Sequence, residues 1–319
     1  MKFVRDSIVI FLLALGLASC GGDSGSASPA ATPVRTPQLF ASLTATDYTA
    51  VVQQLYISYF GRAADTGGLA NFTASLAGMG APSDIQGLSA AYATSPAVRA
   101  LIDSFGNSAE SQALYSGGND AFVTAIYNNV LSRAPDAEGQ AFWVGAINSG
   151  NLTRANASLS IMAGALKNSS AQGLLDAQLI NKRVTIGTNF TAALVSQNQG
   201  GAYSGNTAAA AVRSMLATVT ANTDPAAFQA TINATINSLA ANSPFAQVQG
   251  IINLRCLSCH SGGNAQLGIA LDSPEQIHAL APDIYQQVVV LRTMPYQNQT
   301  QMTNAERAVV AAWFQGGAQ

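Results

Sequence analysis

The sequence predicts an all-α protein, in which a helical repeat region is followed by a small C-terminal helical domain. Apolar residues recur at helical spacing in a segment that occurs twice in the middle of the chain, and again near the C-terminus. Thr303-Asn-Ala-Glu306 has the pattern of a capping box, which marks the start of a last helix. With 319 residues and 48% hydrophobic content, the chain is long and apolar enough for about two folded domains.

The charged residues are few and nearly balanced. Lys and Arg number 14 and Asp and Glu number 16, so the formal net charge is −2. Binding to nucleic acid by counterion release needs a basic surface, and this composition excludes it. Three Cys and two His are too few for a disulfide framework or a polynuclear metal centre, but they are enough for one site.

The first 19 residues are expected to be a signal peptide. Their apolar run, residues 8–17, is shorter than the roughly 20 residues that span a bilayer. Leu17-Ala18-Ser19-Cys20 resembles the bacterial lipobox, which implies that Cys20 is lipidated and begins the mature protein. The alternative is an ordinary secretory signal with an incidental Cys. By the same resemblance, the absence of Asp after Cys20 implies the outer membrane of a bacterial envelope, facing the periplasm or the cell surface.

Residues 20–44 are expected to form a flexible tether, because Gly, Ser, Pro and Thr dominate most of them. The rest of the chain contains no apolar stretch of 18 residues, so the lipid is the only membrane attachment that we expect.

The middle of the chain is internally duplicated. Residues 51–72 and 122–143 match at a constant offset of 71. The paired positions include Tyr56/Tyr127, Arg62/Arg133, Asp65/Asp136, Gly68/Gly139 and Phe72/Trp143. In the first copy, one apolar helical face is expected from Val52, Leu55, Tyr56, Tyr59 and Phe60. Each Asp stands where a second helix can begin, which predicts a helix, a tight turn capped by Asp, and a second helix.

The duplicated segments resemble the DUF4214 repeat family, whose mark is a Tyr-rich helix followed by Gly-Arg-x-x-Asp-x-x-Gly-Leu. The resemblance covers about residues 47–240, within a predicted region 45–243. It implies an interaction or structural module and no chemistry. The Arg and Asp of each turn are interpreted as an ion pair beside a helix cap rather than as a ligand site. Residues 218–241 are expected to form one more helical pair, broken at Asp224-Pro225.

The chemistry is expected in the predicted C-terminal domain, residues 244–319. Cys256-Leu-Ser-Cys259-His260 resembles the attachment motif of c-type haem. Two thiols on one helical turn can form thioethers with the two vinyl groups of a porphyrin, and the adjacent His can coordinate the iron. The expected cofactor is therefore one covalently attached haem c. A thioredoxin-like pair lacks its βαβ context, and a zinc site would need closer His residues than His260 and His278.

The flanks of this motif fit a small cytochrome. A stripe formed by Phe245, Val248, Ile251 and Ile252 leads to Cys256, and a helix is expected between Ile284 and Leu291. The last helix is expected to present Ala308, Val309, Ala312 and Trp313 on one apolar face and to stop at Gly316-Gly317.

Residues 245–317 resemble the cytochrome module at the C-terminus of membrane-bound urate hydroxylases. The segments that carry the resemblance are 271–277, 284–290, Thr293-Met294-Pro295, 301–307 and Trp313. It implies a cytochrome c fold, with Met294 as the distal iron ligand. Met302 and His278 are the competing candidates. No counterpart of the urate-oxidising part exists in this chain, so urate chemistry is not implied.

The sequence therefore predicts an electron carrier of the bacterial envelope, with a periplasmic or envelope redox protein as partner and no substrate of its own. The alternative is a surface scaffold or adhesion protein, in which the helical repeats bind a partner and the haem is a sensor or accessory. A haem peroxidase would need an open iron face, which a Met294 ligand would close.

Overall fold

The computed structural model describes residues 43–318. The predicted signal peptide, Cys20 and nearly all of the predicted tether lie outside these residues. The predicted all-α class is confirmed, because the described chain contains 15 α-helices and no strand. No helix within it is long and apolar enough to cross a membrane.

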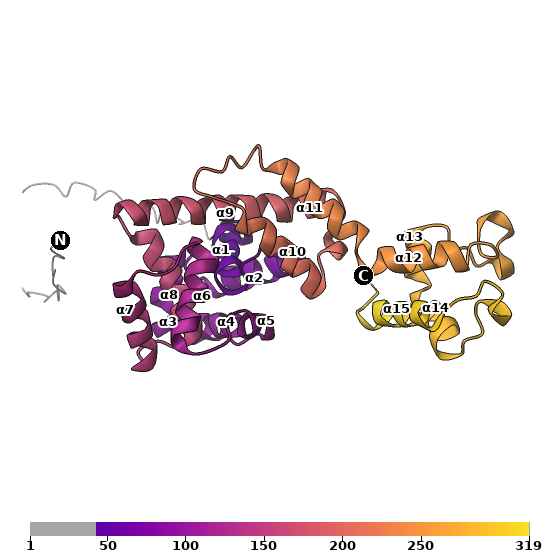
Figure 1. The fold of residues 1–319 in the computed structure, drawn as a ribbon, viewed down its shortest axis with the longest axis horizontal. Coiled ribbons are helices and arrows are strands. Elements are labelled where there is room, and N and C mark those ends of the chain that lie inside the picture. The colour runs from indigo at the N-terminus through magenta and orange to yellow at the C-terminus, as the bar shows by residue number, and fades with distance from the viewer. Residues whose placement is uncertain (1–42, 319) are drawn as a thin grey trace, which may run out of the picture. The chain divides into compact units, whose positions relative to one another are not determined.

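Eleven helices precede residue 244 (Figure 1). They are α1 (Thr49–Phe60), α2 (Thr66–Met79), α3 (Ile85–Thr94), α4 (Pro96–Gly106), α5 (Ala109–Leu114), α6 (Asn119–Leu131), α7 (Ala137–Asn148), α8 (Arg154–Lys167), α9 (Ala171–Ser196), α10 (Gly205–Ala217) and α11 (Gln229–Ala241). Four follow, namely α12 (Pro244–Arg255), α13 (Pro274–Ala279), α14 (Ala281–Tyr285) and α15 (Asn304–Gln315).

The buried apolar side chains form two separate cores. One core draws its residues from positions 48–239 and the other from positions 248–313. The second is small, and its buried members are Val248, Ile252, Leu271, Ile277, Ala281, Ile284, Val288, Met302, Val310 and Trp313. No residue belongs to both cores. The start of a C-terminal domain at residue 244 stays a prediction.

Helix α1 lies at the centre of the first core. It contacts α2, α4, α5, α6, α8 and α9, and Figure 1 shows it enclosed by neighbouring helices. The predicted single apolar face is too narrow, because Gln53 and Ser58 are also fully buried. The Gln53 side-chain amide donates to the Thr191 hydroxyl, and the Ser58 hydroxyl lies 2.8 Å from that of Ser158. Hydrogen bonding inside the core offsets the cost of burying these polar groups, which a hydrophobic pattern cannot show.

The predicted helix–turn–helix units are confirmed in both copies, as α1–α2 and α6–α7. The Asp65 carboxylate accepts the backbone N–H of Gly68 at 2.7 Å, and Asp136 accepts that of Gly139 at the same distance. Both are N-caps in an extended conformation, as the sequence predicts. The first helix of each unit ends in a left-handed residue, Gly61 in one copy and Ser132 in the other.

The prediction of a helical pair within residues 218–241 is wrong. This segment contains one helix, α11, and the helix it contacts, α10, ends before the segment begins, at Ala217. Residues 218–228 form turns, in which Thr223 and Asp224 accept backbone N–H groups. Ser, Thr and Asp side chains compete in this way with helical hydrogen bonds, and here they prevail.

The C-terminal helices begin and end largely as predicted. The Thr303–Glu306 capping box is present, and Val248 and Ile252 of α12 are buried as the stripe predicts. Between Ile284 and Leu291, however, the chain forms only the end of α14 followed by one π-helical turn, Gln286–Val290.

The predicted apolar face of α15 is partly wrong. Trp313 is buried, but Ala308 and Ala312 are exposed, and Arg307 and Val310 face the core instead. The pattern fails because it counts an Arg as polar, whereas the Arg307 guanidinium is buried and hydrogen-bonded to backbone carbonyls.

Candidate functional site

The Cys256–His260 segment forms a single turn directly after α12. The backbone N–H groups of Cys259 and His260 both donate to the carbonyl of Cys256, at 3.1 and 3.0 Å. Both cysteines are free thiols, with Cys256 half-buried and Cys259 exposed. The two thiols and the imidazole therefore lie on one turn, as the motif predicts.

The two thiols have different surroundings. Cys256 packs against the small core together with Leu257, and burial raises the pKa of its thiol to about 11, with a smaller contribution from the charge of Cys259. Cys256 is therefore a protonated thiol at neutral pH.

The orientation of His260 is fixed by the loop that follows it. Its Nδ1 lies 2.9 Å from the carbonyl oxygen of Ile269, and since that oxygen can only accept, Nδ1 carries the proton. Leu271 donates its N–H to the His260 carbonyl, and Gln266 donates to that of Cys259, both at 2.9 Å. This leaves Nε2 as the nitrogen that can coordinate a metal, in the arrangement common for metal-binding histidines.

Met294 follows the π-helical turn and packs against the same small core as Cys256. Its N–H donates to the Gln287 carbonyl at 3.2 Å, and its own carbonyl accepts from Arg307 at 2.8 Å. The backbone of Met294 is thus held by the Gln287 carbonyl on one side and by the Arg307 side chain on the other.

The two competing candidates have other roles in the structure. Met302 is buried inside the small core, and its backbone is paired with the Asn298 side chain. The His278 ring stacks on Phe245 with a centroid distance of 4.2 Å, and its Nδ1 lies 2.9 Å from the Ala318 carbonyl oxygen.

Large apolar side chains remain uncovered close to the motif and to Met294 along the chain. Leu254 is 65% exposed and Leu267 is 88% exposed, while Val290, Leu291 and Tyr296 are exposed to a similar degree. Covering such side chains would add to the stability of a small domain. Two free thiols and an imidazole with Nε2 available, on one turn, are the donor set that c-type haem attachment uses. Within residues 43–318, no group of three or more His, Cys, Asp or Glu side chains could hold a bare metal ion.

The repeat turns hold a second set of charged residues. Arg62 lies over the ring of Tyr56 at 5.2 Å, and Arg133 lies over Tyr127 at 5.3 Å. The predicted ion pair with the Asp of the same turn is confirmed in the first copy, where Arg62 lies 3.6 Å from the Asp65 carboxylate but closer to another acid. It is wrong in the second copy, where Arg133 pairs with Asp176 at 2.6 Å.

That closer acid is Glu110 of α5, which accepts two hydrogen bonds from Arg62 at 2.7 and 2.8 Å. Burial lowers the pKa of Arg62, but hydrogen bonds and charge from Glu110 and Tyr203 outweigh it, so the pKa is raised overall. These arginines are structural, because their donors are committed to neighbouring helices.

Arg183 of α9 is a charged core residue that the hydrophobic pattern of the sequence does not indicate. It is buried and donates to the carbonyls of Asn129 and Val130 and to the Ser132 hydroxyl. Burial lowers its pKa to about 10. It satisfies carbonyls at the C-terminus of α6, a contact between positions more than 50 residues apart that no local pattern could reveal.

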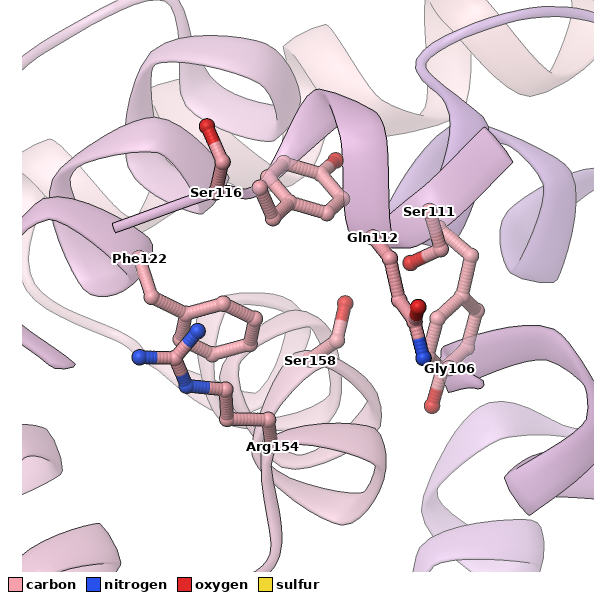
Figure 2. A pocket seen from close by; sticks show the side chains of 9 residues that line it. Gly106, Ser111, Gln112, Ser116, Phe122, Arg154 and Ser158 are labelled. Atoms are coloured by element: carbon pink, nitrogen blue, oxygen red, sulfur yellow. The ribbon is translucent and has the colours of Figure 1, made fainter. Parts of the chain in front are cut away.

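A cavity of about 100 Å³ lies among α1, α4, α5, α6 and α8 (Figure 2). Figure 2 shows Arg154 beside Phe122 on one side of the cavity and Gln112 on the other. Arg154 donates to the Asn119 side chain and the Gly117 carbonyl, and the Ser158 hydroxyl bonds within the core. No His, Cys, Asp or Glu lines this cavity, so it offers no nucleophile paired with a base.

Residues 102–165 match a family described as Domain of unknown function (DUF4214). The match runs from within α4 to within α8 and includes the second copy of the repeat. It confirms the predicted resemblance for this segment. No curated protein and no solved structure matches the chain significantly.

Proposed function

We propose that this chain is an envelope-anchored c-type cytochrome, which carries single electrons through one covalently bound haem. The observation that carries the proposal is the single turn Cys256–His260, with two free thiols and an imidazole whose Nδ1 is committed to the Ile269 carbonyl. Bound there, the haem would supply one iron that changes its oxidation state by one electron.

Each residue of the turn has a separate task in this proposal. Cys256 and Cys259 form the two thioether links, and His260 offers Nε2 as the proximal ligand. Met294 offers its thioether on the distal side. Burial of Met302 and stacking of His278 support this choice among the three candidates.

The charges of residues 244–318 indicate the kind of redox partner. Arg255 is paired with Glu306, and Arg307 is buried. The exposed charged residues that remain are one cation, Arg292, and three acids, Asp272, Glu275 and Asp283. Such a surface gives little electrostatic steering, so we expect a periplasmic or envelope partner whose binding depends weakly on salt.

A visible spectrum tests the cofactor. The full chain, produced in bacteria with a c-type haem maturation system, should be red, and its haem should stay attached after denaturation. The double variant Cys256→Ser/Cys259→Ser should lose the covalent haem. A colourless wild-type protein from cells that mature another cytochrome c would overturn the proposal.

The distal ligand is tested by the ferric spectrum. His–Met ligation gives a weak far-red band, which should be present in the wild type and in Met302→Ala and His278→Ala. The band should be lost in Met294→Ala. Its survival in that variant would show that Met294 is not the ligand.

The anchor is tested separately, because Cys20 lies outside the described residues. Cys20→Ala should release the protein from envelope membranes without affecting haem attachment, since the lipid is proposed as the only membrane attachment. Retention of the variant in the membrane fraction would mean that another element anchors the chain.

A second candidate function concerns the repeat region, for which we propose a DUF4214-like character over about residues 47–240. Phe142 of α7 is 64% exposed, and Leu174 and Leu175 of α9 are also exposed, which favours contact with another molecule. In that case the protein is a surface scaffold or adhesin, and the haem is accessory. Fast, reversible electron exchange with a periplasmic donor supports the carrier, whereas slow exchange with tight binding to a surface polymer supports the scaffold.

A further inference from the structure

Arg307 is a buried cation on the core face of α15. Its side chain is 7% exposed, and none of the ion pairs formed within residues 43–318 involves it. The guanidinium donates instead to the carbonyls of Val288 and Met294, and more distantly, at 3.5 Å, to the Asn298 side-chain oxygen. Burying a charge without an ionic partner is costly unless its N–H groups are hydrogen-bonded. Here the guanidinium of Arg307 has three acceptors, all between residues 288 and 298.

The three acceptors come from three successive parts of the chain. Val288 lies in the π-helical turn, Met294 in the loop that follows, and Asn298 in the next turn. The Asn298 amide extends the contact, since its oxygen accepts the Met302 N–H at 3.0 Å and its nitrogen donates to the Met302 carbonyl at 3.2 Å. Arg307 therefore ties the whole 288–302 segment to the last helix.

Within this segment, the backbone of Met294 is held on both sides. Its carbonyl is held by Arg307, and its N–H is held by the Gln287 carbonyl. Because both backbone groups of Met294 are held in this way, any displacement of this segment also displaces the Met294 side chain. An apolar residue on this face of α15 would suit the small core as well as Arg does, so packing alone does not account for a buried cation here.

We propose that Arg307 is a positioning residue that keeps Met294 in place as the distal ligand. This inference rests on the proposed cytochrome function and on Met294 as ligand. Without the guanidinium, the 288–302 segment would detach more often, and the Met294 thioether would spend less time on the iron. A small external ligand would then compete more successfully for that position.

Imidazole binding to the ferric full-length protein tests this role. Loss of charge-assisted hydrogen bonds in Arg307→Met should strengthen imidazole binding by about tenfold or more. Arg307→Lys keeps the charge and can reach one carbonyl, so it should give an intermediate increase. The Lys variant also keeps the test decisive if Arg307→Met does not fold. The spectrum of the denatured haem in pyridine reports on the thioether links to the protein. Its absorption maxima should be the same in all variants, because the Arg307 substitutions leave these links unchanged.

Arg255→Met is the matched control. Arg255 also donates to a carbonyl of this segment, that of Thr300, and pairs with Glu306, but none of its hydrogen bonds is made with Met294. Imidazole affinity in this variant should stay within about twofold of the wild type. In a Met294→Ala background, Arg307→Met should have no further effect, because the ligand that Arg307 holds is absent.

Unchanged imidazole affinity in both Arg307 variants would overturn the inference, and so would an equal gain with and without Met294. These results differ from failure of the underlying proposals. A wild type without haem would refute the cytochrome assignment, and a haem protein without the far-red band would refute the Met294 assignment.

Discussion

Arg62 and Arg133 show how the two copies of one repeat acquired different partners. Both stack on an equivalent Tyr and donate to the next Ala carbonyl, but their carboxylates come from non-equivalent places, Glu110 and Asp176. Glu110 also pairs with Arg213 at 3.3 Å, so its charge has a second cationic neighbour. Asp176 is nearly fully buried, and among the residues that the structure describes it otherwise accepts only from the Gln172 amide.

The two arginines should therefore differ in their contribution to stability. Arg133→Met is expected to cost about 3 kcal/mol, because it leaves the Asp176 charge buried and unpaired. Arg62→Met should cost about half as much, since Arg213 still compensates Glu110. Urea unfolding followed by circular dichroism measures both. An equal cost would mean that the second cation at Glu110 contributes nothing.

Cys256 and Cys259 should react at different rates in the protein without haem. The reactive form is the thiolate, and raising the Cys256 pKa from its usual 9 to about 11 reduces its thiolate fraction at pH 8 by about 100-fold. Because Cys259 is exposed, iodoacetamide should modify it first, and Cys256 labelling should accelerate as the pH rises toward 11. Mass spectrometry of the peptides measures this order, and faster labelling of Cys256 at pH 8 would contradict it.

Local contacts at the residue scale could be predicted, and distant ones could not. The Asp65 and Asp136 caps bind an N–H three residues ahead, so their spacing alone reveals them. Glu110 lies 48 residues from Arg62, and Asp176 lies 43 residues from Arg133. Which acid approaches each Arg depends on how the helices pack, and the nearest acid in sequence was the wrong choice for Arg133.

At the scale of the helix, each repeat unit is held by a Gly that fits under a Tyr. A Cβ on Gly68 would lie 1.8 Å from the Tyr56 hydroxyl oxygen, and one on Gly139 would lie 3.0 Å from that of Tyr127. Both glycines stand in the first turn of a helix, where Ala would otherwise be favoured by roughly 1 kcal/mol. The shared Gly of the motif is thus explained by close packing, and more strongly in the first copy.

Gly68→Ala should therefore destabilise the protein by about 2 kcal/mol, because the added methyl forces Tyr56 to move. Gly139→Ala is the matched control and should change stability by less than about 1 kcal/mol. Removing the hydroxyl in Tyr56→Phe should reduce the cost of Gly68→Ala. Thermal unfolding of the three single variants and of the double variant Tyr56→Phe/Gly68→Ala measures these effects. Equal effects of the two Gly substitutions would refute the packing explanation.

Element boundaries were predictable where capping residues mark them, and less so where backbone geometry is irregular. The Thr303–Glu306 box fixes the start of α15, and Asp136 fixes that of α7. The π-helical turn at 286–290 has no such mark. The face of α15 was misplaced because the buried Arg307 is satisfied by backbone carbonyls, which hydrophobic spacing does not detect.

At the scale of the whole chain, the all-α class followed from helical spacing alone, but the depth of burial did not. The sequence predicts one apolar face on helix α1, but most of its residues are buried, and Gln53 and Ser58 are hydrogen-bonded inside the core. The proximity of Cys256, Cys259 and His260 was predictable because it is set by one turn of chain. The contact between His260 and Ile269 was not, because it depends on the path of the 261–271 loop.

The two cores are expected to depend on haem to different extents. The core at residues 248–313 is small and leaves Leu254 and Leu267 uncovered, whereas the core at residues 48–239 is large and encloses α1. Small domains need an additional link to be stable, and two thioethers with an iron–His260 bond would supply one.

Hydrogen exchange of Cys256→Ser/Cys259→Ser should therefore show lost protection in residues 244–318 and retained protection in residues 49–241. The wild-type protein with haem is the control, and it should protect both segments. Equal protection of residues 244–318 with and without covalent haem would show that this core is stable by itself.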